Sequence, residues 1–349
     1  MSRLDDVLDL VRIASVSRHE AELAAHVESR LRAAPHLEVE RVGDNVIART
    51  TGLHATRVLV AGHLDTVPGD VATARIEGER LHGLGVVDMK GSLAVMLELA
   101  VDPTPRSVEV TWVFYAREEI ARRESGLVEV AELRPDLLAA DVAVLGEPTA
   151  GAIEAGCQGS MRAVVRLKGV RAHTARPHQG RNAIHRLAGV LELVAGYEPR
   201  VVEMDGVTYV EQLQAVFVDG GVAGNVVPDV ASVVVNHRVA PDRDREAATA
   251  WLVDYLDDVV EDGDEIDVLD WASPAAPSLS NVRLRALADL TGVAVRAKVG
   301  WTDVATFAER GIPATNFGVG DPLLAHTTDE VVSRVELDEY ARILGEWLR

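Results

Sequence analysis

The chain has 349 residues, of which 48% are hydrophobic and only 4% aromatic, and its formal net charge is −20. This length suits two domains, whose cores must rely on aliphatic side chains. The negative charge argues against nucleic acid or an anionic membrane surface as a partner, because phosphate groups are bound by clustered lysine and arginine.

The sequence also favours a cytoplasmic protein. Its single cysteine, Cys157, excludes an intramolecular disulfide and suits a reducing compartment. The first residues, MSRLDDVLDLVRIASVS, carry acidic side chains and lack the apolar segment of a signal peptide. No apolar run reaches the roughly 18 residues that a membrane-spanning helix needs.

The first part of the chain has the pattern of an α/β domain. Hydrophobic spacing predicts two amphipathic helices within residues 4–33, interrupted near residues 15–17. Buried strands are predicted for three short, valine-rich runs at 57–62, 108–116 and 141–146. Helices are predicted at 91–100 and 125–133.

After Gly159 the pattern changes to alternating polar and apolar residues, which is typical of strands with one solvated face. Strands are predicted at 161–168, 207–217, 230–239 and 264–271, with one helix at 182–195. A proline-containing linker at 273–277 precedes three predicted helices at 281–291, 302–310 and 335–348. We therefore expect a discontinuous α/β domain, 1–158 and 274–349, with an inserted α+β domain at 159–273.

Chemically reactive side chains follow the ends of the predicted strands. His63 and Asp65 follow the first strand, Glu118 and Glu119 follow the second, and Glu147 follows the third. In open α/β sheets, ligands bind beyond the carboxyl ends of the strands. These side chains are therefore expected to face one crevice.

Each of these residues alone has an ordinary structural explanation, such as a loop cap or a solvated surface pair. The combination is more specific, because histidine and carboxylates are the preferred ligands of zinc. Two further candidates are Asp88, in the glycine-rich segment HGLGVVDMKGS, and His326, just before the final predicted helix.

Five segments together resemble the co-catalytic zinc deacylase and carboxypeptidase family, which includes aminoacylases and acetylornithine deacetylase. They are AGHLDTVP (61–68), GLGVVDMKGS (83–92), YAREEI (115–120), GEPT (146–149) and LAHTTDE (324–330). The resemblance implies a zinc-peptidase-like catalytic domain with a mixed sheet flanked by helices. The inserted domain would then serve as a lid and dimerisation domain.

The resemblance also implies a role for each site residue. One metal ion would be held by His63, Asp88 and Glu147, and the other by Asp88, Glu119 and His326. The ions would be two divalent metals, zinc or alternatively cobalt. Glu118 would be the general base, and Asp65 would orient the imidazole of His63.

Within the family, the second half of the chain is most similar to the succinyl-diaminopimelate desuccinylases. This similarity implies cleavage of N-succinyl-LL-2,6-diaminopimelate to succinate and LL-2,6-diaminopimelate, in lysine and diaminopimelate biosynthesis. Asn225, Arg238 and Thr302 would bind the substrate, an N-acyl amino acid. This substrate carries several carboxylates, and the protein is acidic. The metal ions, Arg238 and Lys298 would supply positive charge locally at the site.

The chain departs from the pattern of some desuccinylases at residues that would contact the acyl group of the substrate. Cys157 and Gln158 stand where some desuccinylases carry arginine between two glycines, so a different acyl group remains an alternative. An acetylornithine deacetylase-like enzyme or a dipeptide carboxypeptidase would use the same metal ligands. A catalytically inactive, metal-stabilised binding protein is a further alternative, although it would not need Glu118. A nucleotide-binding enzyme is disfavoured, because no G-x-G-x-x-G follows a predicted strand.

His173 lies at the end of the first strand of the insert, where a histidine could simply cap the following turn. The resemblance implies instead that it crosses from a partner subunit and hydrogen-bonds the developing oxyanion. We therefore expect a homodimer in which each active site is completed by the other chain.

Overall fold

The computed structural model describes residues 2–52 and 54–349 of the chain. It divides into two compact units. The first unit comprises Met1–Gly156, Pro277–Lys298 and Thr302–Arg349, and the second comprises Cys157–Ala276 and Val299–Trp301. None of the described helices is long and apolar enough to cross a membrane.

The first unit contains a mixed sheet, for which eight strands lie among the described residues. In spatial order they are β1 (Leu37–Val42), β2 (Asn45–Thr50), β6 (Glu109–Tyr115), β3 (Arg57–His63), β7 (Val142–Leu145), β18 (Ala314–Asn316), β8 (Glu154–Ala155) and β17 (Arg296–Ala297). Strands β6, β3, β7 and β18 are parallel, whereas β1, β2 and β8 form antiparallel pairs. All seven residues of β6 are buried, as expected for a strand covered on both faces.

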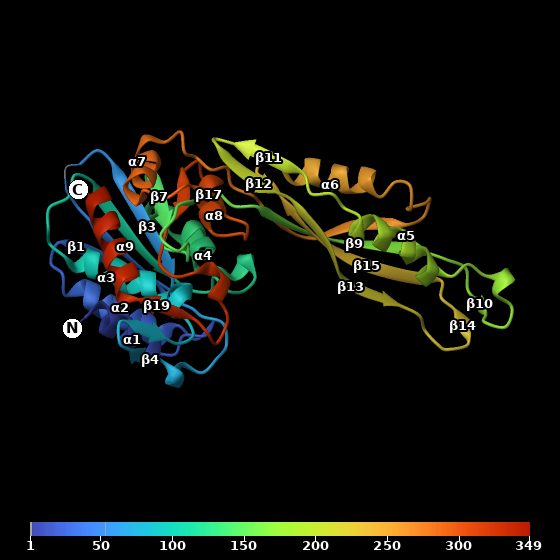
Figure 1. Cartoon of the computed structure of the whole chain (residues 1–349), viewed down its shortest axis with the longest axis horizontal. Helices are drawn as coiled ribbons and strands as arrows, with labels where there is room; N and C mark the ends of the chain where they lie inside the picture. The colour runs from blue at the N-terminus through green and yellow to red at the C-terminus, as the bar shows by residue number, and fades with distance from the viewer. Residues whose placement is uncertain (1, 53) are drawn as a thin grey trace. The chain divides into compact units, whose positions relative to one another are not determined.

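Helices pack against this sheet. They are α1 (Arg3–Arg12), α2 (Ala21–Arg32), α3 (Gly91–Val101), α4 (Gly126–Leu133), α7 (Val282–Thr291), α8 (Val304–Ala308) and α9 (Arg334–Trp347). Helix α3 contacts α1, α2 and α9, and Figure 1 shows α9 alongside it. Both α1 and α9 begin with capping boxes, formed by Ser2 with Asp5 and by Ser333 with Glu336. The two ends of the chain therefore build one helical layer.

A small antiparallel sheet completes the first unit. It consists of β19 (Val331–Ser333), β5 (Arg80–His82) and β4 (Arg75–Glu77). Its middle strand, β5, immediately precedes the glycine-rich segment, and β19 immediately follows the segment that contains His326. The small sheet thus brings two distant segments of sequence side by side.

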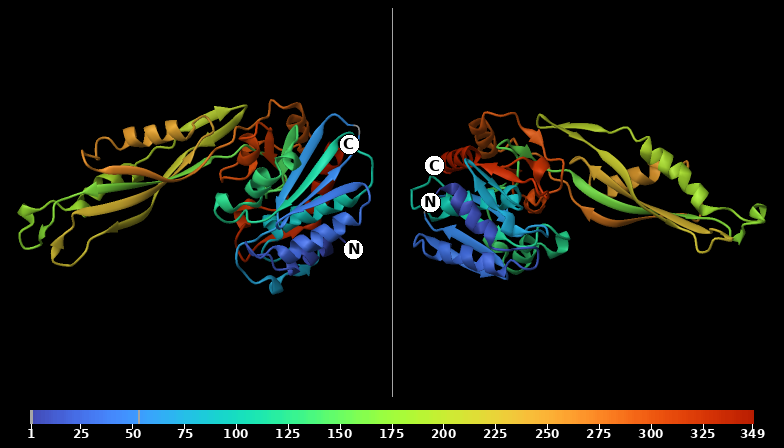
Figure 2. Two further views of the ribbon diagram at one scale, coloured as in Figure 1. Left: turned by 180° about the vertical axis from the view of Figure 1, so that it is seen from behind. Right: turned by 60° about the horizontal axis from the view of Figure 1, so that its bottom comes forward.

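The second unit is an antiparallel sheet covered by two helices. Its strands and helices are β9 (Gly159–Lys168), β10 (Ala172–His173), α5 (Ala183–Ala195), β11 (Val201–Met204), β12 (Val207–Val210), β13 (Gln212–Gly220), β14 (Val226–Val227), β15 (Val230–Val239), α6 (Arg245–Tyr255) and β16 (Glu265–Ala272). The main sheet has the order β13-β15-β9-β16, while β10 pairs with β14 and β11 with β12. Figure 2 shows both helices running along this sheet.

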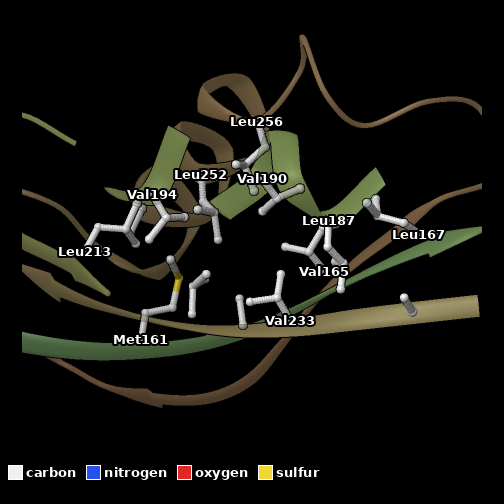
Figure 3. Close-up of a cluster of buried hydrophobic side chains, with 14 of the residues drawn as sticks. Met161, Val165, Leu167, Leu187, Val190, Val194, Leu213, Val233, Leu252 and Leu256 are labelled. Carbon is white, nitrogen blue, oxygen red and sulfur yellow. The ribbon is translucent and has the colours of Figure 1, made fainter. Parts of the chain in front are cut away.

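One apolar cluster forms the core of the second unit (Figure 3). Met161 and Val233 from the strands meet Leu187 and Val190 of α5 and Leu252 of α6. Because both helices contribute to this one cluster, they cover the same face of the sheet. The alternating burial along β15 follows from this arrangement, since every second residue faces the helices.

The mixed α/β class predicted from the sequence is confirmed by this architecture and by the family comparisons reported below. Two predicted elements were wrong in extent. The strand expected at 207–217 is two strands, β12 and β13, separated at Glu211. The helix expected at 302–310 is shorter and spans only Val304–Ala308.

Candidate metal centre and active site

The carboxylate of Asp88 lies between two histidines in the first unit. His63 Nε2 is 2.9 Å from Asp88 Oδ1, and His326 Nε2 is 3.3 Å from Asp88 Oδ2. His326 Nε2 is also 3.0 Å from Glu119 Oε1. Ligand atoms of His63, Asp88 and Glu119 all lie within 4.8 Å of one another. These four residues come from four separate segments of sequence.

The glycine-rich segment brings Asp88 to this position through a tight turn, η2 (Val86–Lys90). Gly85 has φ +83°, and a Cβ atom there would lie 2.7 Å from Thr66 Cγ2. Only glycine meets both demands without strain. The segment contains a cis peptide bond between Asp88 and Met89.

Glu118 and Glu119 follow the end of β6, and the carboxylate of Asp65 holds both of their backbones. The amide of Glu118 donates to Asp65 Oδ1 at 2.9 Å, and the amide of Glu119 donates to Oδ2 at 3.1 Å. The hydroxyl of Ser17 also donates to Oδ2, at 2.7 Å. Asp65 is fully buried, so these charge-assisted bonds fix the segment that carries both glutamates.

The contact between Asp65 and His63 differs from the expected one. His63 Nδ1 lies 2.9 Å from the backbone carbonyl of Asp65, whereas the carboxylate is 3.7 Å away. The carbonyl accepts from Nδ1–H, so Nε2 is the ring nitrogen that would be available to a metal ion. Asp65 therefore orients His63 through its main chain and the two glutamates through its side chain.

Glu147 follows β7 and is buried, and its Oε1 atom has no hydrogen-bond partner among the described residues. The pKa of Glu147 is raised to about 7, chiefly by burial and next by the charge of Asp88, while His63 and Lys298 act in the opposite direction. The Lys298 amine is 3.1 Å from Glu154 Oε2 and 3.3 Å from the Pro148 carbonyl. Lys298 thus supplies positive charge beside Glu147.

The electrostatics of the cluster suit a site for a cation. Burial, followed by the charge of Glu147, raises the pKa of Glu118 well above its usual value. Burial opposes ionisation of Asp88, but hydrogen bonds from His326 and His63 outweigh it and lower the pKa. Hydrogen bonds to the carboxylates of Asp88 and Glu119 raise the pKa of His326 to about 10. Gathering these acids in one place is costly unless positive charge accompanies them.

The residues fit a pair of divalent metal ions. Imidazole nitrogens and carboxylate oxygens are the ligands that zinc prefers, and an unpartnered buried oxygen at Glu147 is available as one more. Asp88 presents one oxygen to each histidine, as a bridging ligand must. His326 has a side chain that is 50% exposed, so the cluster is open to solvent on that side.

His173 and Asn225 lie together in the second unit. His173 pairs with Val226 across the short β10–β14 ribbon, and the amide of Thr174 donates to the Asn225 carbonyl at 3.0 Å. The amide of Ala175 donates to His173 Nδ1 at 3.0 Å. This bond makes Nδ1 an acceptor, so the exposed ring presents Nε2–H as a donor.

The other two predicted substrate residues differ in burial. Arg238, on β15 of the second unit, is half-buried, and burial lowers its pKa. Its guanidinium forms no ion pair within the described part of the chain. Thr302, in the first unit, is buried, and its hydroxyl donates to Asn316 Oδ1 at 2.9 Å. Cys157 and Gln158 are also buried, and Gln158 donates to the Val210 carbonyl at 2.9 Å.

Two buried charged residues near the cluster were missed by sequence reasoning. The Lys90 amine donates to the carbonyls of Leu10 and Ile13, at 3.2 and 2.9 Å, and burial lowers its pKa to about 7. Glu330 accepts hydrogen bonds from backbone amides at the cluster. Both residues stand inside segments already noted, DMKG and LAHTTDE, so their charge within these segments was the available signal.

Comparisons with known proteins identify the family of the chain. Residues 59–349 match the peptidase family M20/M25/M40. A Mycobacterium tuberculosis protein, assigned provisionally as a succinyl-diaminopimelate desuccinylase, is 50% identical over 326 residues, covering 93% of this chain and 91% of that protein. The Corynebacterium glutamicum succinyl-diaminopimelate desuccinylase is 44% identical over 346 residues, with coverages of 97% and 94%.

Solved structures show the same fold at low sequence identity. Aminopeptidase PepT from Bacillus cereus has a TM-score of 0.80 at 19% identity, with 99% of this chain and 97% of that chain covered. YXEP from Bacillus subtilis, described as a dinuclear metal-binding peptidase, has a TM-score of 0.74 at 17% identity, with coverages of 99% and 96%. From its sequence match and its close relatives, the chain belongs to the M20/M25/M40 peptidase family.

Proposed function

We propose that the chain is a two-metal amidohydrolase that cleaves N-succinyl-LL-2,6-diaminopimelate to succinate and LL-2,6-diaminopimelate. The observation that carries the chemistry is the Asp88 carboxylate between His63 and His326, with Glu118 close by but outside the ligand set. The substrate assignment is supported by relatives of this name at 44–50% identity. The activity would serve lysine and diaminopimelate biosynthesis in the cytoplasm.

In this proposal His63, Asp88 and Glu147 hold one ion, and Asp88, Glu119 and His326 hold the other. Zinc suits the mixed nitrogen and oxygen donors, and cobalt would accept the same ligands. When bound, the ions supply the Lewis-acid chemistry that polarises an amide carbonyl and activates water.

Glu118 moves the proton. Its pKa is raised by burial and by neighbouring carboxylates, which makes it a stronger base than an ordinary glutamate. It would accept a proton from the attacking water and then deliver that proton to the leaving amine. Asp65 holds the Glu118 backbone at 2.9 Å and so sets where this carboxylate can reach.

The second unit would supply binding groups for the substrate. Arg238 is half-buried without a countercharge among the described residues, so a substrate carboxylate would complete it. Asn225, which lies beside His173, would form hydrogen bonds with the backbone-like groups of the substrate. In the first unit, Thr302 would line the substrate pocket, and its hydrogen bond to Asn316 would hold its side chain in place.

We further propose a homodimer in which His173 acts in the active site of the other chain. Its Nε2–H is a suitable donor for the oxyanion that forms on the scissile carbonyl. Strand β13 supports self-association, because it is an outer strand whose Phe217 is 69% exposed and whose Val216 and Val218 are also exposed. An apolar outer strand of this kind is a ready pairing edge. The second unit would then serve both as lid and as dimerisation domain.

The test is a substrate screen with metal-stripped and metal-replete protein. N-succinyl-LL-2,6-diaminopimelate should be cleaved much faster than N-acetylornithine or dipeptides, and only when metal is present. The buried Cys157–Gln158 pair favours one alternative, because it departs from the arginine of some desuccinylases. Preference for an acetylated substrate would therefore move the assignment to a deacetylase. Metal binding without hydrolysis of any substrate would favour a binding protein.

A further inference from the structure

Glu330 is a buried glutamate in the first unit that the proposed chemistry does not use. It ends the segment LAHTTDE and directly precedes β19, and its residue surface is only 1% exposed. A buried carboxylate is costly unless hydrogen-bond donors surround it. The groups that donate hydrogen bonds to the Glu330 carboxylate therefore indicate what this residue does.

The Glu330 carboxylate joins the backbones of two candidate metal ligands. Oε2 accepts from the amide of Val87 at 2.9 Å and from the amide of Asp88 at 3.3 Å. Oε1 accepts from the amide of His326 at 3.2 Å. One side chain thus spans the two segments that carry the bridging carboxylate and its exposed histidine partner.

The position of Glu330 is itself fixed by the small sheet. Its carbonyl accepts from the amide of Gly83 at 3.1 Å, and the following strand β19 pairs with β5. His326 has φ +65°, a left-handed conformation that residues other than glycine rarely adopt. The bond from the His326 amide to Glu330 holds the backbone in this conformation.

We propose that Glu330 is a positioning residue that sets the separation of Asp88 and His326, and so the affinity of the ion these two ligands share with Glu119. This inference rests on the proposed two-metal function. His63 and Glu147 reach the cluster from the ends of β3 and β7, with which Glu330 forms no hydrogen bond among the described residues. Loss of the Glu330 clamp should therefore weaken the two ion sites unequally.

The experiment uses full-length, metal-stripped protein titrated with Co²⁺, followed by calorimetry and by visible absorption. Glu330→Gln keeps the size of the side chain but turns one acceptor into a donor that faces backbone amides. Glu330→Asp keeps the charge but is too short to reach both segments. Glu119→Gln removes one ligand and identifies which binding step belongs to the His326 site. Thermal unfolding of each metal-free variant reports stability separately.

Glu109→Gln is the matched control. Glu109 is also buried in the first unit and accepts a hydroxyl bond from Thr50 at 2.6 Å and an amide bond from His54 at 3.2 Å. It lies outside the metal cluster, so its loss should affect stability without changing Co²⁺ affinity. Any general effect of neutralising a buried carboxylate will appear in this variant.

Both Glu330 variants should bind Co²⁺ about 10–100-fold more weakly at the His326 site, the usual cost of losing an outer-sphere partner. The other site should change by no more than about threefold. Unchanged affinity at both sites, or equal loss at both, would overturn the positioning role. If Glu330→Gln does not fold, Glu330→Asp decides by the same criteria. Failure of the wild-type protein to bind two ions would instead refute the proposed function.

Discussion

Replacing Glu118 with glutamine separates proton transfer from metal binding. The substitution keeps the volume of the side chain, and the backbone amide that donates to Asp65 at 2.9 Å is retained. Glu118 is also outside the proposed ligand set of His63, Asp88, Glu119, Glu147 and His326. The fold and the metal content should therefore survive the change.

The catalytic loss should be large, because an amide side chain cannot take a proton from water. General acid–base catalysis contributes about 10²–10⁴-fold, which corresponds to about 2.7–5.5 kcal/mol of transition-state stabilisation. The upper part of this range is expected, since the proposal assigns both proton transfers to this one carboxylate and its raised pKa makes it an effective base. The loss should fall on kcat, with KM changed little.

Glu119→Gln is the matched comparison, because it makes the same chemical change one residue away. The Glu119 amide also donates to Asp65, at 3.1 Å, but its side chain contacts His326. Initial rates of amine release and metal content by atomic emission should be measured for both variants. Glu119→Gln should lose about one ion, whereas Glu118→Gln should retain both. The assignment of Glu118 fails if its variant keeps more than about a tenth of wild-type turnover.

Chelation should abolish hydrolysis, and added zinc or cobalt should restore it; full activity in protein shown to be metal-free would contradict this. Arg238→Ala should raise KM more than it lowers kcat, because a charge-assisted carboxylate contact is lost. Purified heterodimers of one His173→Ala chain and one Glu118→Gln chain should have about half the activity of a wild-type dimer, since one of the two sites is intact; an assembled but inactive heterodimer would rule out action in trans. Burial alone would raise the pKa of Glu211, but its hydrogen bonds with His237, Arg200 and the Ala240 amide outweigh burial and lower the pKa from 4.5 to about 2. The ionised side chain therefore contributes about 3 kcal/mol to the free energy of unfolding above pH 4.5, and this contribution is lost as the pH falls toward 2. Glu211→Gln should therefore flatten this part of the stability–pH curve measured by denaturant unfolding.

The sequence indicated the central strands and the side chains at their ends because both are local signals. The valine-rich runs match β3, β6 and β7, and the reactive residues follow each run directly. By contrast, the hairpin of β1 and β2 was not predicted, since its residues LEVERV and NVIART carry charges that mask the strand pattern. Strand β18 was also missed, because three residues contain too little periodicity.

Other features depend on contacts between distant segments, which no local pattern encodes. The carboxylate of Asp65 turns toward the Glu118 and Glu119 amides, and only the folded backbone brings those donors within reach. The break between β12 and β13 has a similar origin. Glu211 fits the alternation of one long strand, but its buried side chain binds Arg200 and the Ala240 amide instead.

The position of β18 in the sheet has a consequence for synthesis on the ribosome. Ala314–Asn316 lies between β7 and β8, both of which are made more than 150 residues earlier. Until this segment emerges, the growing chain holds a sheet with an open slot and lacks the final histidine, His326. Nearly all of the second unit is one continuous stretch, Cys157–Ala276, so it can fold while it waits. A nascent chain would therefore complete the proposed set of metal ligands only after residue 326 has been made, well after the continuous stretch of the second unit.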